Sequence, residues 1–403
     1  MKTKTCLSLL AAFAASALVA ATPVIKADSV TFSQNTTTRL VTIGYTLEET
    51  DAVVTVDVLT NGVSIGEENF ANIDGDVNRR IAPGDHLIVW HPRASWPDHV
   101  FTNNEVSVEV RAWDVTIPPD YMVVDLTATN ALVRYYVSTN ALPAGGLTND
   151  IYRSTKLVMR RIPASGNVWT MGSPEGELAR VANREIQRLV TMTNDYYLGV
   201  FPVTLAQHQR VIGSRPSGTT VYENEYSQLY GESYDNLRGA SVNWPSTGHA
   251  VGDMSHLKKW RDLTGLDLDL PTSAQWEFAC RAGTSTIFFF GTETNKLANY
   301  AWCKENYNGQ QRCVGVKLPN PFGLYDLYGN GWEWCLDWTG GISSDPVVEP
   351  VGPEDGSLDQ NRRVGRGGNN GGGPDSCRSA KVNPQPPTGG YGYRLLCPPT
   401  LKW

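Results

Sequence analysis

The segment at residues 323–338, GLYDLYGNGWEWCLDW, constrains the fold more than any other part of the chain. It sets glycine-flanked polar turns among large aromatic residues, and its polar and glycine positions are Asp326, Gly329, Asn330, Gly331 and Glu333. Glycine lets backbone carbonyls turn inward, and carboxylate, amide and carbonyl oxygens are the ligands that Ca²⁺ prefers. The segment therefore predicts a cation site that aromatic rings shield from water.

The length and the net charge of the chain limit its possible folds and partners. At 403 residues the chain is long enough for two hydrophobic cores. A net charge of −7 argues against a phosphate-backbone binder, which needs a basic face, so we expect no nucleic-acid partner. Charged residues make up 19% of the chain, and glycine, proline and tryptophan are plentiful, which indicates a loop-rich fold held by aromatic packing.

The first 27 residues resemble a secretory signal. Lys2 and Lys4 precede an apolar run at residues 7–19, and a small-residue cleavage site follows at residues 19–21. A membrane anchor is the weaker interpretation, because the run is short and a polar segment follows. We therefore expect a secreted, periplasmic or cell-envelope protein without a transmembrane segment after cleavage.

The cysteines outside this signal lie in the last third of the chain: Cys280, Cys303, Cys313, Cys335, Cys377 and Cys397. Cysteines of an exported protein usually pair, although the sequence does not select the pairing. Cys303 and Cys313 flank a short polar turn and could close a local loop. Zinc is the competing interpretation, but no Cys-x-x-Cys pair supports it.

Alternating, β-branched runs at residues 28–116 predict a small β-sandwich of immunoglobulin or fibronectin type. Asn61-Gly62 between two such runs is a hairpin signal. Proline and polar residues mark 117–153 as a connecting region, and a second domain is expected at 154–403. The chain is thus predicted to pair an all-β domain with an α+β domain.

Three helices are expected in the second domain. Thr204 can cap one, and Thr272 with Gln275 forms a capping box for another that Gly283 ends. In GDMSHLKKWRDLTG, the residues Met254, Leu257 and Trp260 form one apolar stripe, while His249 and His256 lie outside it. The remainder, with short apolar pieces between glycines and prolines, predicts irregular structure.

Several blocks occur in order across the second domain: residues 171–173 (MGS), 270–281 (LPTSAQWEFACR), 323–326 (GLYD), 329–330 (GN), 332–334 (WEW), 366–368 (RGG), 378–380 (RSA) and 392–394 (GYR). Together they resemble the formylglycine-generating enzyme, or sulfatase-modifying factor, family. The resemblance implies a variant of the C-type-lectin fold with much irregular structure, often stabilised by calcium. It also implies a copper site that oxidises a cysteine of a sulfatase. Two cysteines hold the copper in that site, because thiolates suit Cu(I).

The sequence departs from that family pattern after Arg366. The segment reads NNGGGPDSCRSA, with Asn369 where the family usually has serine and no cysteine before Cys377. The resemblance suggests that Cys280 pairs with Cys377. Copper is therefore not expected, and formylglycine generation is in doubt.

The predicted cation site agrees with the family pattern better than the copper site does. Register against the family places Asp326 and Glu333 as calcium ligands together with the carbonyls of Gly329 and Gly331. In related lectin-like proteins the carboxy-terminal region displays the contact residues, which correspond here to Asn369, Asn370, Asp375 and Tyr391. We read Arg366, Arg378 and Arg394 as structural charge partners.

Three hypotheses follow. In the favoured one, an exported domain of this family lacks the oxidase site and binds a protein or glycan partner. In the second, the chain is an active formylglycine-generating oxidase. In the third, it is a structural envelope protein.

Overall fold

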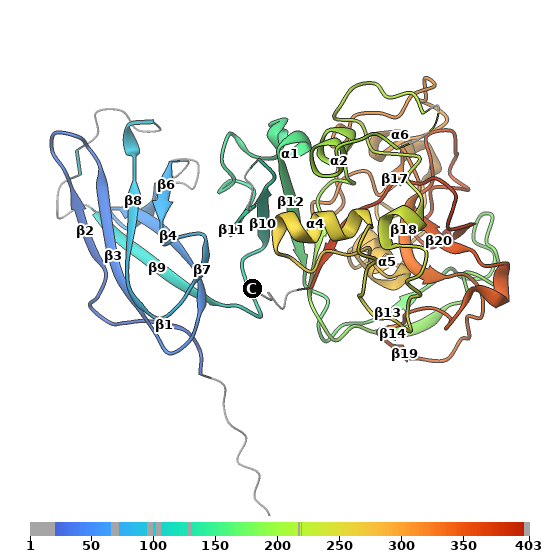
Figure 1. The fold of residues 1–403 in the computed structure, drawn as a ribbon, viewed down its shortest axis with the longest axis horizontal. Helices are drawn as coiled ribbons and strands as arrows, with labels where there is room; N and C mark the ends of the chain where they lie inside the picture. The colour runs from blue at the N-terminus through green and yellow to red at the C-terminus, as the bar shows by residue number, and fades with distance from the viewer. Residues whose placement is uncertain are drawn as a thin grey trace, which may run out of the picture.

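The computed structural model describes residues 21–65, 72–94, 100–101, 106–127, 131–216, 218 and 220–398. An amino-terminal region of strands, blue in Figure 1, lies beside a larger region of strands, short helices and long loops. The predicted signal sequence lies mostly outside the described residues. Among the described helices, none is both long and apolar enough to cross a membrane.

The amino-terminal region forms two sheets. One contains β1 (Val24–Ile25), β2 (Thr31–Gln34), β3 (Val41–Glu48), β6 (Ile73–Gly75) and β8 (Gly84–Trp90). The other contains β4 (Ala52–Thr60), β5 (Val63–Ser64), β7 (Arg79–Ile81) and β9 (Val106–Asp114). Every second residue of β3 is buried, and side chains from both sheets share one core, as the alternating sequence pattern predicts. Asn61 and Gly62 form the tight β4–β5 turn with positive φ values of 50° and 77°.

The main sheet of the larger region begins earlier than the sequence indicates. Its order is β11 (Leu132–Tyr136), β10 (Tyr121–Asp125), β12 (Lys156–Ile162), β15 (Tyr196–Gly199) and β22 (Leu396–Cys397), all antiparallel. Residues 117–153 therefore do not only connect two domains, because β10 pairs along its whole length with β12. A single apolar run gave too little signal to predict both strands.

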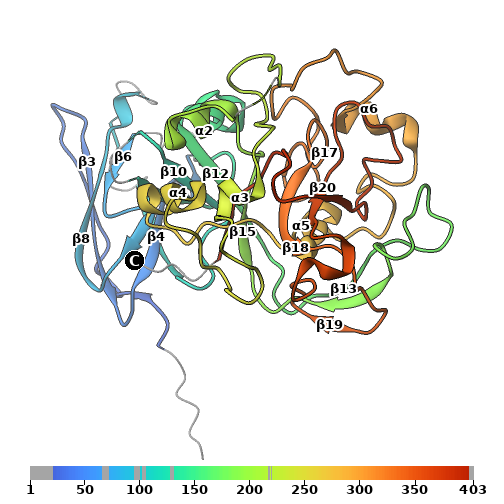
Figure 2. The same ribbon diagram turned by 45° about the vertical axis from the view of Figure 1, so that its right-hand side comes forward.

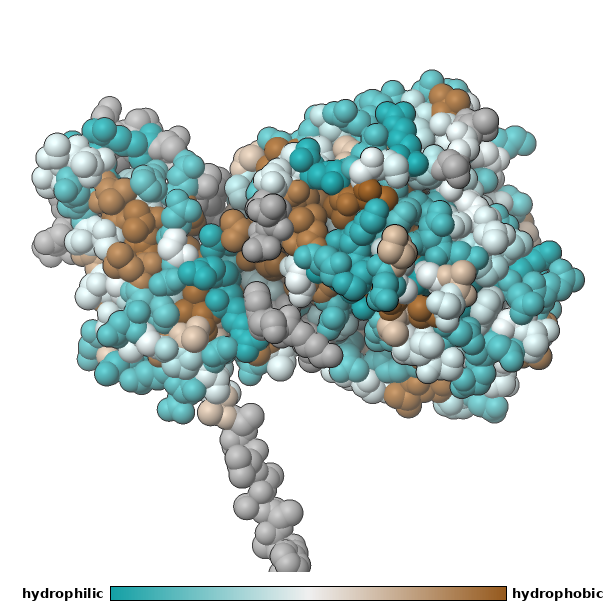
Figure 3. Space-filling model, in the orientation of Figure 1, coloured by the Kyte–Doolittle hydropathy of each residue, from teal (hydrophilic) through white to brown (hydrophobic). Residues whose placement is uncertain are grey.

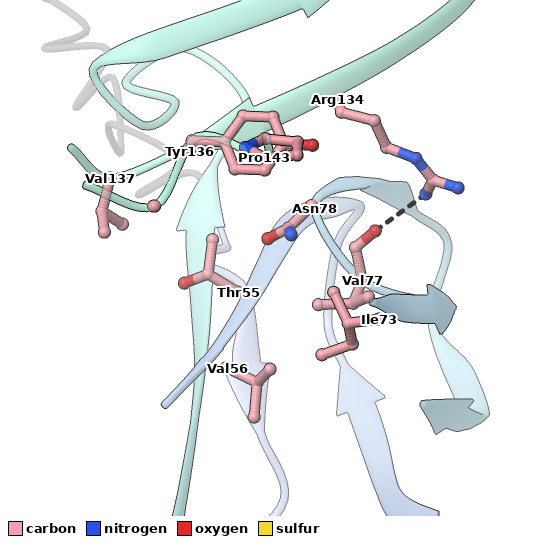
Figure 4. Close-up of a pocket in the computed structure, with 10 residues that line it drawn as sticks. Thr55, Val56, Ile73, Val77, Asn78, Arg134, Tyr136, Val137 and Pro143 are labelled. Atoms are coloured by element: carbon pink, nitrogen blue, oxygen red, sulfur yellow. Dashed lines mark hydrogen bonds between the residues drawn. The ribbon is translucent and has the colours of Figure 1, made fainter. Parts of the chain in front are cut away.

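The two regions are joined by direct contacts as well as by the chain. The backbone N–H of Tyr135 on β11 donates to the carbonyl of Asn78 at 2.7 Å, and Arg134 Nη1 donates to the Val77 carbonyl at 2.9 Å (Figure 4). A small cavity of about 70 Å³ lies at this contact between the side chains of Thr55, Ile73 and Tyr136. The β-sandwich is thus docked on the edge of the main sheet.

Short elements fill the rest of the larger region. The further strands are β13 (Val168–Met171), β14 (Arg188–Thr191), β16 (Ala301–Trp302), β17 (Tyr328–Gly329), β18 (Glu333–Trp338), β19 (Val347–Val348), β20 (Arg363–Arg366) and β21 (Asn383–Gln385). The α-helices are α1 (Ile151–Ser154), α2 (Leu205–Ile212), α3 (Tyr234–Arg238), α4 (His256–Thr264), α5 (Ser273–Arg281) and α6 (Leu297–Tyr300). Short 3₁₀ turns occur at Pro92–Ala94, Gly146–Thr148, Thr294–Lys296 and Gly356–Asp359. Figure 2 shows α2 and α4 close together, in agreement with their packing contact.

The predicted helix ends are largely confirmed. Thr272 and Gln275 form both hydrogen bonds of a capping box at α5, and Thr204 with Gln207 does the same at α2. The left-handed residue that ends α5 is Ala282, with φ 45°, one position before the predicted Gly283. Gly283 is also left-handed, at φ 89°, so the chain turns over two residues.

The interior of the larger region holds fully buried arginines as well as aromatic rings. Arg366 Nη2 lies 3.1 Å from Glu277 Oε2, and Arg378 Nη1 lies 2.7 Å from Glu185 Oε2. Because these charges are paired in the interior, they fix the irregular loops together with the aromatic packing, as predicted for the arginines.

The surface in the view of Figure 3 is largely hydrophilic, with hydrophobic patches on the β-sandwich and near its junction with the larger region.

Candidate functional site

Residues 323–338 form part of the buried framework. They contain β17 and β18, and Trp334 is completely buried with its ring 4.5 Å from that of Tyr391. The indole N–H of Trp334 donates to the carbonyl of Glu232 at 2.7 Å. The aromatic residues thus tie the segment to two distant parts of the chain, which agrees with the predicted enclosure.

Glu333 has both carboxylate oxygens occupied. Its Oε1 accepts from Arg394 Nη2 at 2.8 Å, and its Oε2 accepts from Arg394 Nε at 3.1 Å and from Trp276 Nε1 at 2.8 Å. Arg394 balances the charge of this buried carboxylate. As arranged, Glu333 does not fit the role of a free calcium ligand, because a cation there would have to displace the guanidinium.

Asp326 is the predicted ligand that fits a cation. Its Oδ2 accepts from the backbone N–H of Gly315 at 2.6 Å, but its Oδ1 is buried without a hydrogen-bond partner among the described residues. Burial raises the pKa of this carboxyl to about 6, because the charged form loses its hydration. An unpartnered buried carboxylate oxygen is a position where a cation would remove an energetic cost.

The two predicted glycines contribute through close approach. A Cβ on Gly329 would lie 2.1 Å from the Trp302 carbonyl oxygen, and its φ is 72°, so a side chain is excluded there. The carbonyl of Gly331 accepts from the Gln228 side-chain amide at 2.9 Å. The close approach at Gly329 keeps the turn compact beside Asp326, and the role of the two carbonyls as cation ligands stays a prediction.

The cysteines form no disulfide in the described residues. All six are free thiols, so neither the predicted Cys280–Cys377 bridge nor the Cys303–Cys313 bridge is present. The Cys303 thiol instead lies 2.8 Å from Glu305 Oε2, and the Cys313 thiol 3.2 Å from Asn224 Oδ1. These thiols therefore have oxygen partners where the prediction placed sulfur.

Cys377 is buried under the Arg-Gly-Gly block. A Cβ added to Gly368 would lie 2.7 Å from its sulfur, which is why glycine is needed there. Burial, and then the neighbouring Cys303, raise the pKa of Cys377 well above its ordinary value. The backbone N–H of Lys304 donates to the Gly372 carbonyl at 3.0 Å and brings Cys303 to the segment that precedes Cys377.

The predicted contact residues divide into two groups. Asn370 is 8% exposed and donates to the carbonyl of Gln310, and Tyr391 is 2% exposed with its hydroxyl bonded to Asn383. Both lie in the framework and do not face a partner. Asp375 is exposed and Asn369 half-buried, so only these two could meet a ligand at this loop.

A separate cleft of about 620 Å³ lies beside α5 and β15. Its polar lining includes Asn194, Asp195, Asp267, Gln275 and Glu349, and its aromatic lining is Tyr196 and Trp244. The Trp244 ring packs on His249 at a centroid distance of 5.0 Å. The cleft thus combines side-chain oxygens and amides with the largely buried rings of Tyr196 and Trp244, and its size is that of a small-ligand site.

Sequence reasoning missed this cleft. Its walls come from residues 194–196, 244–275, 349–351 and 396–398, which share no local motif. The signal that could have drawn attention to it is the cluster of polar residues after β14, NDY at residues 194–196, since such loops often carry contacts.

The matches to known proteins concern this larger region. The sulfatase-modifying factor enzyme 1-like domain matches residues 160–396. A serine/threonine-protein kinase pkn1 of Chlamydia pneumoniae is 30% identical over 214 residues, covering 50% of this chain and 32% of the kinase. A formylglycine-generating enzyme of Bos taurus is 26% identical over 249 residues, covering 52% of this chain and 65% of the enzyme.

Among solved structures, PvdO from Pseudomonas aeruginosa has a TM-score of 0.49 and 21% identity, with 60% of this chain and 94% of PvdO covered. Of the two sequence relatives named above, the chain spans about a third of the Chlamydia pneumoniae kinase and less than two-thirds of the bovine enzyme. The domain match covers more than half of the chain and carries the sequence blocks described above. This chain therefore belongs to the family of sulfatase-modifying factor enzyme 1-like proteins.

Proposed function

We propose that this chain is an exported member of its family that binds a glycan in the cleft beside α5, without acting as a cysteine oxidase. The observation that supports it is the lining of the cleft, which combines carboxylates, amides and aromatic rings in about 620 Å³. Sugar hydroxyls donate and accept, so they suit carboxylate acceptors such as Asp267 and side-chain amides such as that of Gln275, both in the lining of the cleft. The side chain of Gln275 also caps α5, so this part of the wall is rigid.

The same proposal is supported by the state of the thiol in the family's oxidase segment. Residues 369–376 contain no cysteine, and Cys377 is packed beneath Gly368. A thiol whose pKa is raised by burial is a poor source of thiolate. The loop at Asn369 and Asp375 is exposed enough to contribute a secondary contact.

A glycan array followed by calorimetry tests the proposal. We expect the purified chain to bind one glycan class, and Asp267→Ala to weaken that binding at least about tenfold. Asp345→Ala, at an exposed aspartate outside the cleft, is the control. Absence of any bound glycan, or equal binding by Asp267→Ala, would reject it. Capture of a basic peptide by the same cleft would show a protein ligand instead.

One observation favours a second candidate, an active cysteine oxidase. The hydrogen bond from the Lys304 backbone N–H to the Gly372 carbonyl brings Cys303 to the segment that precedes Cys377, so Cys303 could supply the second sulfur for Cu(I). The experiment is Cu(I) titration followed by incubation with a cysteine-containing sulfatase peptide in aerated buffer with a thiol reductant, because molecular oxygen is the oxidant. Stoichiometric aldehyde that disappears in Cys303→Ser would establish this candidate and remove the first.

For calcium, we propose that Asp326 supplies the carboxylate and that Gly329 and Gly331 supply carbonyls, with Glu333 kept by Arg394. The unpartnered Oδ1 of Asp326 supports this choice. The ion would brace the turn at residues 326–331, since a bound cation offsets the cost of the buried charge.

A further inference from the structure

Three ligand-type side chains meet outside the cleft and outside residues 323–338. His208 lies on α2, His256 is the first residue of α4, and Glu232 lies in the loop before α3. Nε2 of His208 is 3.5 Å from Glu232 Oε2, and Nδ1 of His256 is 3.3 Å from the same oxygen. One ligand atom from each residue lies within 4.8 Å of the others.

These three atoms are buried and lack hydrogen bonds. His208 Nε2, Glu232 Oε2 and His256 Nδ1 have no hydrogen-bond partner in the part of the chain that the structure describes. His208 is 0% exposed and Glu232 1%. The contacts that these atoms make with one another, at 3.5 Å and 3.3 Å, are longer than good hydrogen bonds, so an ion at their centre would satisfy all three.

The other polar atoms of His208 and Glu232 are held in place. His208 Nδ1 lies 3.1 Å from the Tyr393 hydroxyl, which accepts from Trp260 Nε1 at 3.1 Å. Glu232 Oε1 accepts from the backbone N–H of Ser233 at 3.1 Å. Such outer contacts orient metal-binding histidines and carboxylates, so the unpartnered atoms are aimed at one another by the surrounding fold.

The spacing matches that of a shared ion. Ligand atoms about 2.1 Å from zinc in tetrahedral geometry lie about 3.4 Å from one another. The two nitrogen–oxygen distances to Glu232 Oε2, 3.5 Å and 3.3 Å, already have this value. The two histidine nitrogens also lie within 4.8 Å of each other.

We propose that His208, Glu232 and His256 bind one divalent transition-metal ion. Imidazole nitrogens with a single carboxylate suit Zn²⁺ and its neighbours and are unsuited to Ca²⁺ or Mg²⁺, which prefer oxygen shells. The His256 side chain is 19% exposed, against 0% for His208, so the ion is reached from the His256 side. Three protein ligands leave a fourth position for water or a small substrate.

Metal binding by the full chain tests the proposal, with Zn²⁺ followed by calorimetry and Co²⁺ followed by its visible spectrum. Purified, metal-stripped protein is compared with His256→Ala and Glu232→Gln, which alter the partly exposed ligand and the central oxygen. His91→Ala, at an exposed histidine of the β-sandwich, is the matched control. Circular dichroism confirms that each variant is folded.

We expect one ion per chain, a Co²⁺ spectrum without thiolate charge-transfer bands, and affinity lost at least about tenfold in both ligand variants but kept in the control. Three results would overturn the proposal. They are the absence of binding by the wild type, unchanged affinity in both ligand variants, and a thiolate band that assigns the metal to the cysteines.

Discussion

Arg394 holds Glu333 with two hydrogen bonds in the interior, from Nη2 to Oε1 at 2.8 Å and from Nε to Oε2 at 3.1 Å. Both side chains are at most 1% exposed. Arg394 also donates to the carbonyls of Gly199, Val200 and Tyr325, so the pair joins the main sheet to residues 323–338. This ion pair explains why glutamate and arginine are needed at positions 333 and 394. It does not require Glu333 to bind a metal.

Removing one partner of this ion pair should lower the stability of the folded chain. We expect Arg394→Met to lower the free energy of unfolding by about 3 to 5 kcal/mol, because Glu333 is left as an uncompensated buried charge. Urea unfolding measures the change. The double variant Glu333→Leu with Arg394→Met should recover most of the loss, and failure to recover would mean that the arginine contacts to the backbone dominate.

The Asp326 carboxyl should make stability depend on pH in a specific direction. Burial raises its pKa from 3.8 to about 6, so the folded state keeps the proton longer than the unfolded chain. Its contribution to the free energy of unfolding therefore falls as pH rises from about 4 to about 6. In calcium-free buffer, Asp326→Asn should gain about 2 to 3 kcal/mol relative to wild type between pH 4 and pH 7.

Parallel denaturant curves at both pH values measure this gain. Asp345→Asn, at an exposed position, serves as the control and should show no such difference. A gain for Asp326→Asn that is the same at both pH values would contradict the desolvated state of this carboxyl.

Calcium should stabilise the protein through the same carboxylate. At a concentration about 100 times the dissociation constant, a ligand that binds only the folded state adds about 2.7 kcal/mol. We expect Ca²⁺ to raise the melting temperature of the wild type at pH 7 and to leave Asp326→Asn unchanged. Equal shifts in both proteins would place the ion elsewhere.

The thiols should differ in reactivity. Cys313 is partly exposed, while Cys280, Cys335 and Cys377 are fully buried, and burial raises the pKa of Cys280 to about 12. Burial and Glu223 also raise the pKa of Cys313, so the native protein should react with a thiol reagent faster at Cys313 than at the buried positions because of its exposure. Cys313→Ser should remove the fast phase, whereas a fast phase that persists would show that a buried thiol is accessible.

A metal at His208, Glu232 and His256 should couple to folding, because it links α2, α4 and the loop before α3. We expect Zn²⁺ to raise the melting temperature and a chelator to reverse the rise. His256→Ala should abolish the response and His91→Ala should keep it. A response retained in His256→Ala would contradict a stabilising ion at this cluster.

Much of the architecture can be read from local sequence. Alternation in residues 41–48 and the Asn61-Gly62 turn predict the strands and the hairpin, since side-chain direction and turn conformation depend on neighbouring residues. The capping residues Thr272 and Gln275 fix the start of α5 for the same reason. The family blocks indicate the fold of the larger region, and the buried arginines match their predicted structural role.

Tertiary structure decided what those residues do. Glu333 looked like a ligand, but Arg394, 61 positions away, takes both of its oxygens. Tyr391 and Asn370 looked available for contact, but packing buries them. His208, Glu232 and His256 have no motif spacing, yet three separate segments bring their atoms within 4.8 Å. Sequence by itself determined the local elements and the family, because both depend on near neighbours and ordered blocks, whereas the sites depend on long-range contacts that only the folded chain creates.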